Sequence, residues 1–158
     1  AVLIYLAIYL FMNIGTFACI LCMRRGGRMV EGIDDLAGLG KTHPMIALAL
    51  AIFMFSMAGI PPLAGFFGKL YVFQAAIAEE LYTLAIIGVL TSVVGAFYYL
   101  RIIRIMYFDE AEDPLDQSVD REIGALLTLT GILIVAFIAY PEPLVSNAAA
   151  AAASLFSS

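Results

Sequence analysis

Four long apolar stretches, separated by polar connections, constrain the fold of this chain more than any other feature of its sequence. They cover residues 1–23, 44–78, 81–107 and 123–140. A helix needs about 20 apolar residues to cross a hydrocarbon core about 30 Å thick, so the first, third and fourth stretches each fit one crossing. Hydrophobic residues make up 63% of the 158 residues, which is more than a soluble domain of this length can bury. The sequence therefore predicts an all-α membrane protein with four transmembrane helices.

The second apolar stretch is too long for one straight crossing. Its thirty-five residues would form a helix of about 52 Å, at about 1.5 Å per residue. Within it lies the segment GIPPLAGFFGK, residues 59–69, in which Pro61 and Pro62 lack backbone donors and Gly59 and Gly65 add flexibility. We predict a discontinuous helix that is non-helical over residues 59–63 and helical again by Phe66. Broken helices at membrane depth are typical of transport sites, although a simple proline kink is the alternative.

The polar connections predict how the helices are arranged in the membrane. Only Glu79 and Glu80 join the second and third stretches, which favours antiparallel neighbours. Residues 24–43 and 108–122 form the two long connections, and antiparallel crossings place them on the same side. Seven of the eight cations fall in or beside them, so the positive-inside rule assigns this side to the cytoplasm or matrix. The seven are Arg24, Arg25, Arg28, Lys41, Arg101, Arg104 and Arg121.

The eighth cation, Lys69, is the candidate catalytic residue, with the role of a proton relay. It lies about 15 Å from the Glu79 interface, near the middle of the membrane. A lysine at that depth cannot reach water by snorkelling and needs a partner or a hydrated cavity. Burial favours its neutral form, which would let it exchange protons at physiological pH. The alternative is a structural lysine that holds the bundle together through carbonyl contacts.

Other polar residues have weaker functional interpretations. His43, before Pro44, is a candidate for proton access or an ordinary loop residue. Cys19 and Cys22 are predicted to pack as small apolar residues, because a zinc site needs more ligands. We expect Asn13 and Thr16 to form interhelical hydrogen bonds. No metal site is predicted, and no basic patch interleaved with aromatic residues suggests nucleic acid.

Three further patterns concern packing and surfaces. Small residues recur every four positions at Gly88, Ser92 and Ala96, which predicts close approach of another helix. Tyr98 and Tyr99 fit an interfacial aromatic belt. The acidic residues of the last long connection lack the spacing of a calcium-binding loop and are predicted to be solvated. They are Asp109, Glu110, Glu112, Asp113, Asp116 and Asp120.

The apolar stretches and the broken segment together resemble an antiporter-like subunit of bacterial respiratory complex I, subunit N of NADH:quinone oxidoreductase. The resemblance rests on YLAIYLFMNIGTFA (5–18), HPMIALALAIFMFSMAGIPPLAGFFGKLYVF (43–73) and GAFYYLRIIRIMYF (95–108). Antiporter-like subunits share GIPPLAGFFGK broadly, whereas the YYLR stretch with lysine at position 69 points to subunit N; subunit M is expected to carry glutamate there. The resemblance implies that residues 1–143 are the last four of fourteen helices and that 144–158 form an alanine-rich tail. Because the chain begins inside an apolar run, we also expect it to be the C-terminal part of a longer protein.

The same resemblance implies a function. The subunit would help translocate protons across a membrane, with Lys69 in the distal proton path. The resemblance favours the bacterial inner membrane over the mitochondrial inner membrane. It implies no cofactor on this chain, with NADH, FMN, iron–sulfur clusters and quinone bound elsewhere in the complex. The implied partners are the lipid bilayer and other membrane subunits, including the antiporter-like subunit M and the small subunit K. Two alternatives stay open: a subunit of a multi-subunit sodium/proton antiporter, and a structural membrane scaffold.

Overall fold

The computed structural model describes residues 1–110, 115–116 and 121–156 of the chain, and almost all of its regular structure is helical. The elements follow one another as α1 (Val2–Cys22), β1 (Arg24–Arg25), β2 (Arg28–Met29), the short 3-10 helix η1 (Asp34–Leu36), α2 (Leu39–Thr42), α3 (Pro44–Ala58), α4 (Ala64–Ala78), α5 (Tyr82–Phe108), α6 (Arg121–Ala139) and α7 (Glu142–Phe156).

The helix bounds confirm the predicted all-α membrane architecture. Among the described residues, α1 and α5 are each long and apolar enough to cross a membrane. Up to four spans result if the bent pairs α2–α3 and α6–α7 each count as one. The observed α1, α5 and α6 match the predicted stretches to within two residues at each end.

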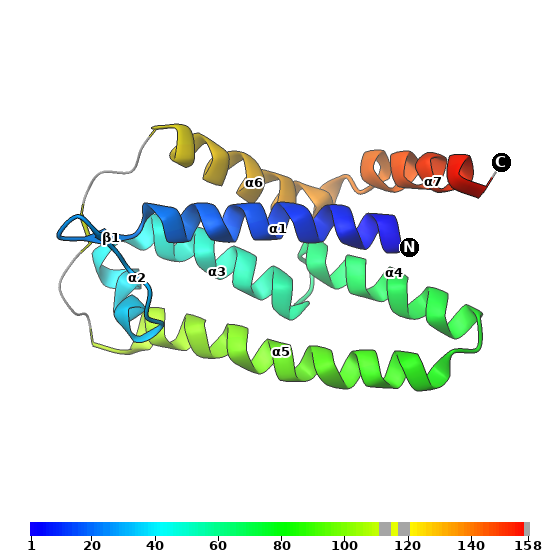
Figure 1. Ribbon diagram of the computed structural model, residues 1–158, viewed down its shortest axis with the longest axis horizontal. Helices are drawn as coiled ribbons and strands as arrows, with labels where there is room; N and C mark the ends of the chain where they lie inside the picture. Colours follow the sequence, from blue (N-terminus) through cyan, green and yellow to red (C-terminus); the bar gives the residue numbers. More distant parts are fainter. Residues whose placement is uncertain (111–114, 117–120, 157–158) are drawn as a thin grey trace.

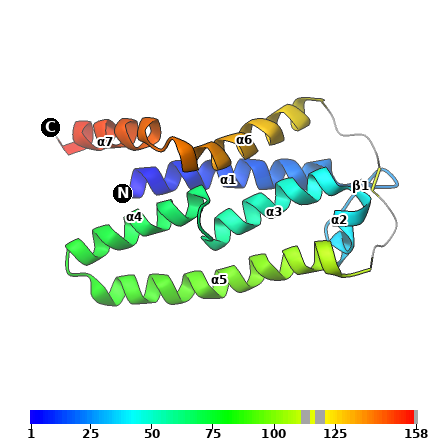
Figure 2. The ribbon, with the colours of Figure 1, turned by 180° about the vertical axis from the view of Figure 1, so that it is seen from behind.

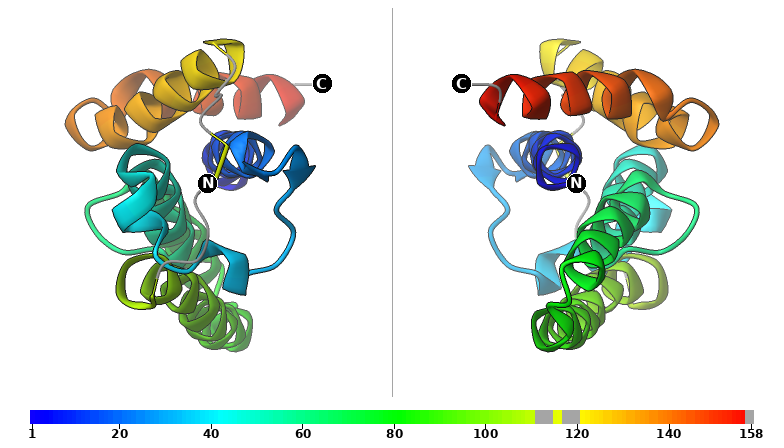
Figure 3. Two further views of the ribbon diagram at one scale, coloured as in Figure 1. Left: turned by 90° about the vertical axis from the view of Figure 1, so that its left-hand side faces the viewer. Right: turned by 90° about the vertical axis from the view of Figure 1, so that its right-hand side faces the viewer.

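The bundle is built around α1, as Figures 1 and 2 show. It packs against α3, α4 and α6, and α3 packs in turn against α5. The end-on views in Figure 3 show α6 and α7 on one side of α1 and α5 on the other. A buried cluster of aliphatic, methionine and phenylalanine side chains fills the space between them, and its most enclosed large member is Phe53 at 0% exposure.

The predicted interruption of the second apolar stretch is confirmed. Helix α3 ends at Ala58 and α4 begins at Ala64, so residues 59–63 lie outside both helices. The Pro61–Pro62 peptide bond is cis. In Figure 1 the start of α4 lies beside the end of α3, and the two half-helices continue along the bundle between α1 and α5.

The first long connection, the end of α5 and the start of α6 lie at the same end of the bundle, as predicted from antiparallel crossings (Figure 1). Residues 24–29 form a two-stranded antiparallel hairpin that the sequence analysis did not predict, with a turn at Gly26 and Gly27, both at positive φ. The Asp116 carboxylate accepts hydrogen bonds from the Gly26 N–H (3.0 Å) and the Gly27 N–H (2.8 Å). The sequence analysis did not predict this contact, in which paired turn amides bind the carboxylate of a half-exposed residue. Of the other acidic residues of this connection, Glu112, Asp113 and Asp120 lie outside the described residues.

The alanine-rich segment, for which the sequence predicted no structure, forms α7. Alanine has the highest helix propensity, and Glu142 in the first turn suits the positive end of the helix dipole. The helix begins just before the predicted tail and packs against α1.

Candidate functional site

Lys69 lies on the second turn of α4 and reaches back to the end of α3. Its Nζ donates hydrogen bonds to the Met57 carbonyl at 2.9 Å and to the Ala58 carbonyl at 3.4 Å. Among the described residues it forms no ion pair. These carbonyl contacts match the structural alternative, in which the lysine holds the bundle together.

The carbonyl partners follow from the way α3 ends. A helix leaves its last four carbonyls without an intrahelical donor. Gly59 has a φ of 82°, which only glycine adopts readily, and its N–H caps the Phe55 and Ser56 carbonyls. The two carbonyls that remain, those of Met57 and Ala58, are the ones that bind Lys69. A cation also suits the negative end of the α3 dipole.

The crossing of α4 over α3 sets the position of Lys69. Gly65 and Ser56 meet at this crossing, where the Gly65 N–H donates to Ser56 Oγ at 3.0 Å. A Cβ atom at position 65 would overlap the backbone carbonyl of Ser56, so only glycine permits this approach. Ser56, which is fully buried, also donates to Met12 Sδ at 3.0 Å. Sequence analysis missed Ser56, although a lone serine in an apolar helix could have drawn attention to it.

Lys69 also lines a polar cavity of about 180 Å³, which we call the lysine cavity. Its walls come from α1, α3, α4 and α5, and its polar groups include several hydroxyls. The lining residues are Tyr5, Tyr9, Met12, Met57, Gly65, Lys69, Thr91, Ser92, Gly95 and Tyr99. At about 30 Å³ per water molecule, this volume holds on the order of six waters.

The structure decides three of the weaker predictions around this site. The stripe of Gly88, Ser92 and Ala96 faces α4, which confirms the predicted approach of another helix. A Cβ atom at position 88 would meet the Phe73 side chain of α4. Ser92 and Ala96 line a second cavity beside Lys69. Tyr98 is exposed, but Tyr99 faces the lysine cavity rather than an interfacial belt. The prediction of interhelical hydrogen bonds is wrong for Thr16, which donates to the Met12 carbonyl one turn earlier in α1.

The same correction applies to Asn13, which donates to the Tyr9 carbonyl within α1. In a helix, an asparagine or threonine side chain can donate its hydrogen bond to a backbone carbonyl of the preceding turn. Cys19 and Cys22 are buried, as predicted, and neither forms a disulfide. No group of three or more metal-ligating side chains occurs within residues 1–110, 115–116 and 121–156.

The structure does not bring His43 and Lys69 together. His43 precedes α3, and Lys69 contacts the last residues of that helix, so about 20 Å separates them, at about 1.5 Å per residue. The His43 Nδ1 atom is buried without a hydrogen-bond partner in the described part of the chain. His43 lines neither of the two cavities beside Lys69.

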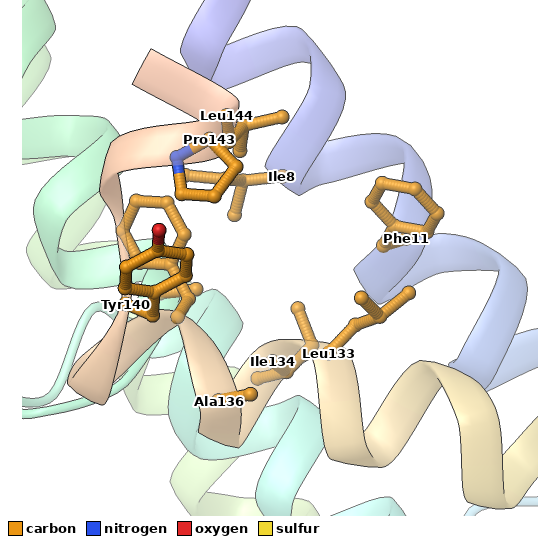
Figure 4. Close-up of a pocket in the computed structure, with 10 residues that line it drawn as sticks. Ile8, Phe11, Leu133, Ile134, Ala136, Tyr140, Pro143 and Leu144 are labelled. Atoms are coloured by element: carbon orange, nitrogen blue, oxygen red, sulfur yellow. The ribbon is translucent and has the colours of Figure 1, made fainter. Parts of the chain in front are cut away.

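Two apolar cavities elsewhere in the described residues are lined without charged side chains. Figure 4 shows one of about 260 Å³ between α1 and the bend that joins α6 to α7, with Ile8, Phe11, Ile134 and Leu144 around it. A groove of about 630 Å³ between α3 and α6 is also lined without any charged side chain. Neither is lined by an amine, a carboxylate or an imidazole, whereas the surroundings of Lys69 combine an amine with several hydroxyls and form the candidate site.

Comparisons with known proteins agree with this geometry. A family model described as "NADH:quinone oxidoreductase/Mrp antiporter, TM" matches residues 1–95. NADH-quinone oxidoreductase subunit N of Paramagnetospirillum magneticum is 62% identical over 98% of this chain and 32% of the relative. Subunit N of Rhodospirillum rubrum is 61% identical over the same shares. The chain thus spans about a third of the length of the curated relatives it matches.

One solved structure extends the similarity to three dimensions. A chain of respiratory complex I from Thermus thermophilus with bound aureothin is similar with a TM-score of 0.74 and 29% sequence identity. The match covers 88% of the present chain and 32% of that one.

Proposed function

The chain belongs to the NADH:quinone oxidoreductase/Mrp antiporter transmembrane family, and we propose that it helps translocate protons across a membrane, with Lys69 as the proton relay. The observation that carries the proposal is the placement of the Lys69 amine. It bridges the two uncapped carbonyls of a broken helix and lines a cavity with room for water.

The hydrogen bonds of Lys69 are compatible with loss and gain of a proton. A protonated lysine has three N–H donors, and a neutral amine keeps two. The Met57 and Ala58 carbonyls need two donors. Lys69 can therefore release its proton without leaving either carbonyl unpaired, while the third N–H of the charged form can donate to a water molecule in the lysine cavity.

The hydroxyl groups of the lysine cavity can continue such a chain of hydrogen bonds. Tyr5, Tyr9 and Tyr99 lie on its walls with Thr91 and Ser92. A hydroxyl both donates and accepts, so it can pass a proton to or from ordered water. His43, whose Nδ1 has no hydrogen-bond partner among the described residues, would serve proton access at the start of α3.

The similarity to subunit N relatives supports a wider assignment, which also belongs to the proposal. The protein would be a membrane subunit of a proton-pumping NADH:quinone oxidoreductase in the bacterial inner membrane. NADH, FMN, iron–sulfur clusters and quinone would be bound by other subunits, and the antiporter-like subunit M and the small subunit K would be neighbours. Residues 1–143 would form the antiporter-like part, with the alanine-rich tail after it.

Proton pumping by the intact complex with substitutions at Lys69 tests the proposal. Lys69→Ala should assemble and oxidise NADH but pump fewer protons in membrane vesicles. Lys69→Arg should restore pumping only in part, because arginine does not readily release its proton, whereas Lys69→Glu, which can titrate, should retain some. Wild-type pumping by a fully assembled Lys69→Ala complex would refute the relay and favour the scaffold role.

The family description also covers Mrp antiporters, so a sodium/proton antiporter is the second candidate. The two differ in their partners. Copurification of the full-length subunit with flavin and iron–sulfur subunits would exclude the antiporter, and its isolation with other membrane subunits alone would exclude the oxidoreductase.

A further inference from the structure

A further cavity, distinct from the two beside Lys69, lies next to the lysine cavity on the side of the loop that follows α1. We call it the loop-side cavity; its volume is about 310 Å³. Side chains from α1, α3 and α5 line the loop-side cavity, and these are three of the four helices that line the lysine cavity. Residues 29–33 and Leu36, from the loop after α1, cover it.

The two cavities are one helical turn apart on each shared helix. On α1 the lining passes from Met12 to Thr16, four positions on. On α3 the lining passes from Met57 back to Met54, and on α5 it passes from Tyr99 to Ile102, a step of three residues in each helix. Residues three or four apart lie on the same face of a helix. A single layer of side chains, about 5 Å thick, therefore separates the two cavities.

Methionine dominates this layer. Met12, Met54 and Met57 are 3%, 4% and 9% exposed. Methionine is unbranched and flexible, so its side chain can move aside without displacement of the backbone. Such a layer blocks water when its side chains extend across it and admits water when they rotate away.

The position of Met12 is linked to the broken helix. Ser56 Oγ donates to Met12 Sδ at 3.0 Å and accepts from the Gly65 N–H at 3.0 Å. The Met12 side chain is thus held by the same serine that joins α3 to the first turn of α4. Movement of α4 relative to α3 would change the Gly65–Ser56 bond, and the Ser56 hydroxyl couples that bond to the one that holds Met12.

We propose that the loop-side cavity is a water-accessible route by which protons reach Lys69, and that Met12, held by Ser56, closes it. The inference rests on the proposed function in so far as Lys69 is the group that receives the proton. The substance that enters is water carrying a proton.

Most side chains that line the loop-side cavity are apolar, but polar groups lie at both of its ends. Glu31 and Gly32 line the loop-side cavity and are exposed. The loop there is held in place by the Gly32 N–H, which donates to Asp35 Oδ2 at 3.0 Å, and by the Arg25–Asp35 ion pair at 3.5 Å. At the inner end Thr16 supplies a hydroxyl next to the methionine layer.

Thiol labelling of the intact complex tests this route without reference to pumping. The probe is 2-aminoethyl methanethiosulfonate, a small cation, and peptide mass spectrometry reads each site. Leu36→Cys reports on the loop-side cavity and Ser92→Cys on the lysine cavity, and neither residue belongs to the methionine layer. We expect the Leu36→Cys thiol to react quickly from the side of the long connections, and the Ser92→Cys thiol to react slowly from that side.

Adding Ser56→Ala should speed labelling of the Ser92→Cys thiol about fivefold, the factor expected for loss of one neutral hydrogen bond. Met12→Ala should speed it further and serves if Ser56→Ala fails to assemble. Thr91→Ala is the matched control, because Thr91 lines the lysine cavity but donates only to the Ile87 and Gly88 carbonyls, and it should leave the rate unchanged.

Three results would overturn the inference. They are an unreactive Leu36→Cys thiol, equal labelling of both reporters in the otherwise unchanged protein, and no acceleration by either Ser56→Ala or Met12→Ala. None of these depends on the role of Lys69, which the pumping assay decides separately. A failure of the route is therefore distinguishable from a failure of the proposed function.

Discussion

Replacing Gly65 with alanine should separate the two halves of the broken helix and displace Lys69. A Cβ atom at this position would lie 2.7 Å from the Ser56 carbonyl carbon and 3.0 Å from Ser56 Oγ. Favourable contacts between carbon atoms begin at about 3.5 Å, so the start of α4 must shift by about 1 Å. The obstacle is backbone rather than the end of a flexible side chain, and it cannot turn away.

The shift has a structural cost and a functional cost. Overpacking of this kind typically costs about 1–3 kcal/mol, and the bond from the Gly65 N–H to Ser56 would weaken as well. The Lys69 Nζ atom is 2.9 Å from the Met57 carbonyl oxygen. A displacement of about 1 Å can take this pair beyond hydrogen-bonding distance. We therefore expect both lower stability and lower pumping.

Heating the intact complex and measuring how much of the subunit stays assembled on native gels tests this prediction. Gly131→Ala is the matched control, because a Cβ there would meet nothing within 4 Å, and alanine is favoured over glycine in a helix by about 1 kcal/mol. The Gly65→Ala complex should dissociate at a lower temperature than wild type, and the Gly131→Ala complex should not. Equal midpoints for the two variants would refute the argument from close approach.

Three more predictions follow from the break and the connections. Gly59→Ala should destabilise the subunit by roughly 1–2 kcal/mol, because φ is 82° there; an unchanged dissociation temperature would contradict this. Asp116→Asn should speed hydrogen exchange at the two glycine amides of the hairpin turn on the order of tenfold or more, since a charged acceptor is lost; exchange at the wild-type rate would show that the carboxylate does not hold the turn. Cysteines introduced at positions 35 and 80 should be labelled from opposite sides of the membrane, the first from the cytoplasm, and labelling from one side would contradict the crossing pattern.

Sequence reasoning located the helices and the break because both depend on local chemistry. Long apolar runs and paired prolines act within a few residues, so the ends of α3 and α4 could be predicted closely. The close approach of α5 to α4 at Gly88 was also predictable, since spaced small residues have few other uses in an apolar helix.

Features that depend on contacts between distant segments could not be predicted from the sequence. Asp116 meets the hairpin turn across about ninety residues of sequence, and nothing in either segment specifies that pairing. The role of Ser56 depends on Met12 and Gly65 being brought together by two helix crossings. The carbonyl partners of Lys69 became identifiable only when the capping of α3 showed which two carbonyls were left.

The most direct test of the central claim is the number of protons pumped per electron by the complex with Lys69→Gln. Glutamine keeps donors for the Met57 and Ala58 carbonyls but cannot take up or release a proton at physiological pH. The purified complex is reconstituted in liposomes, and NADH oxidation and internal acidification are measured together, with Lys41→Gln as a control at an exposed lysine. The relay predicts that Lys69→Gln assembles and transfers electrons but pumps fewer protons per electron, while Lys41→Gln matches wild type. A wild-type ratio for Lys69→Gln would contradict the account and leave Lys69 as a structural cap.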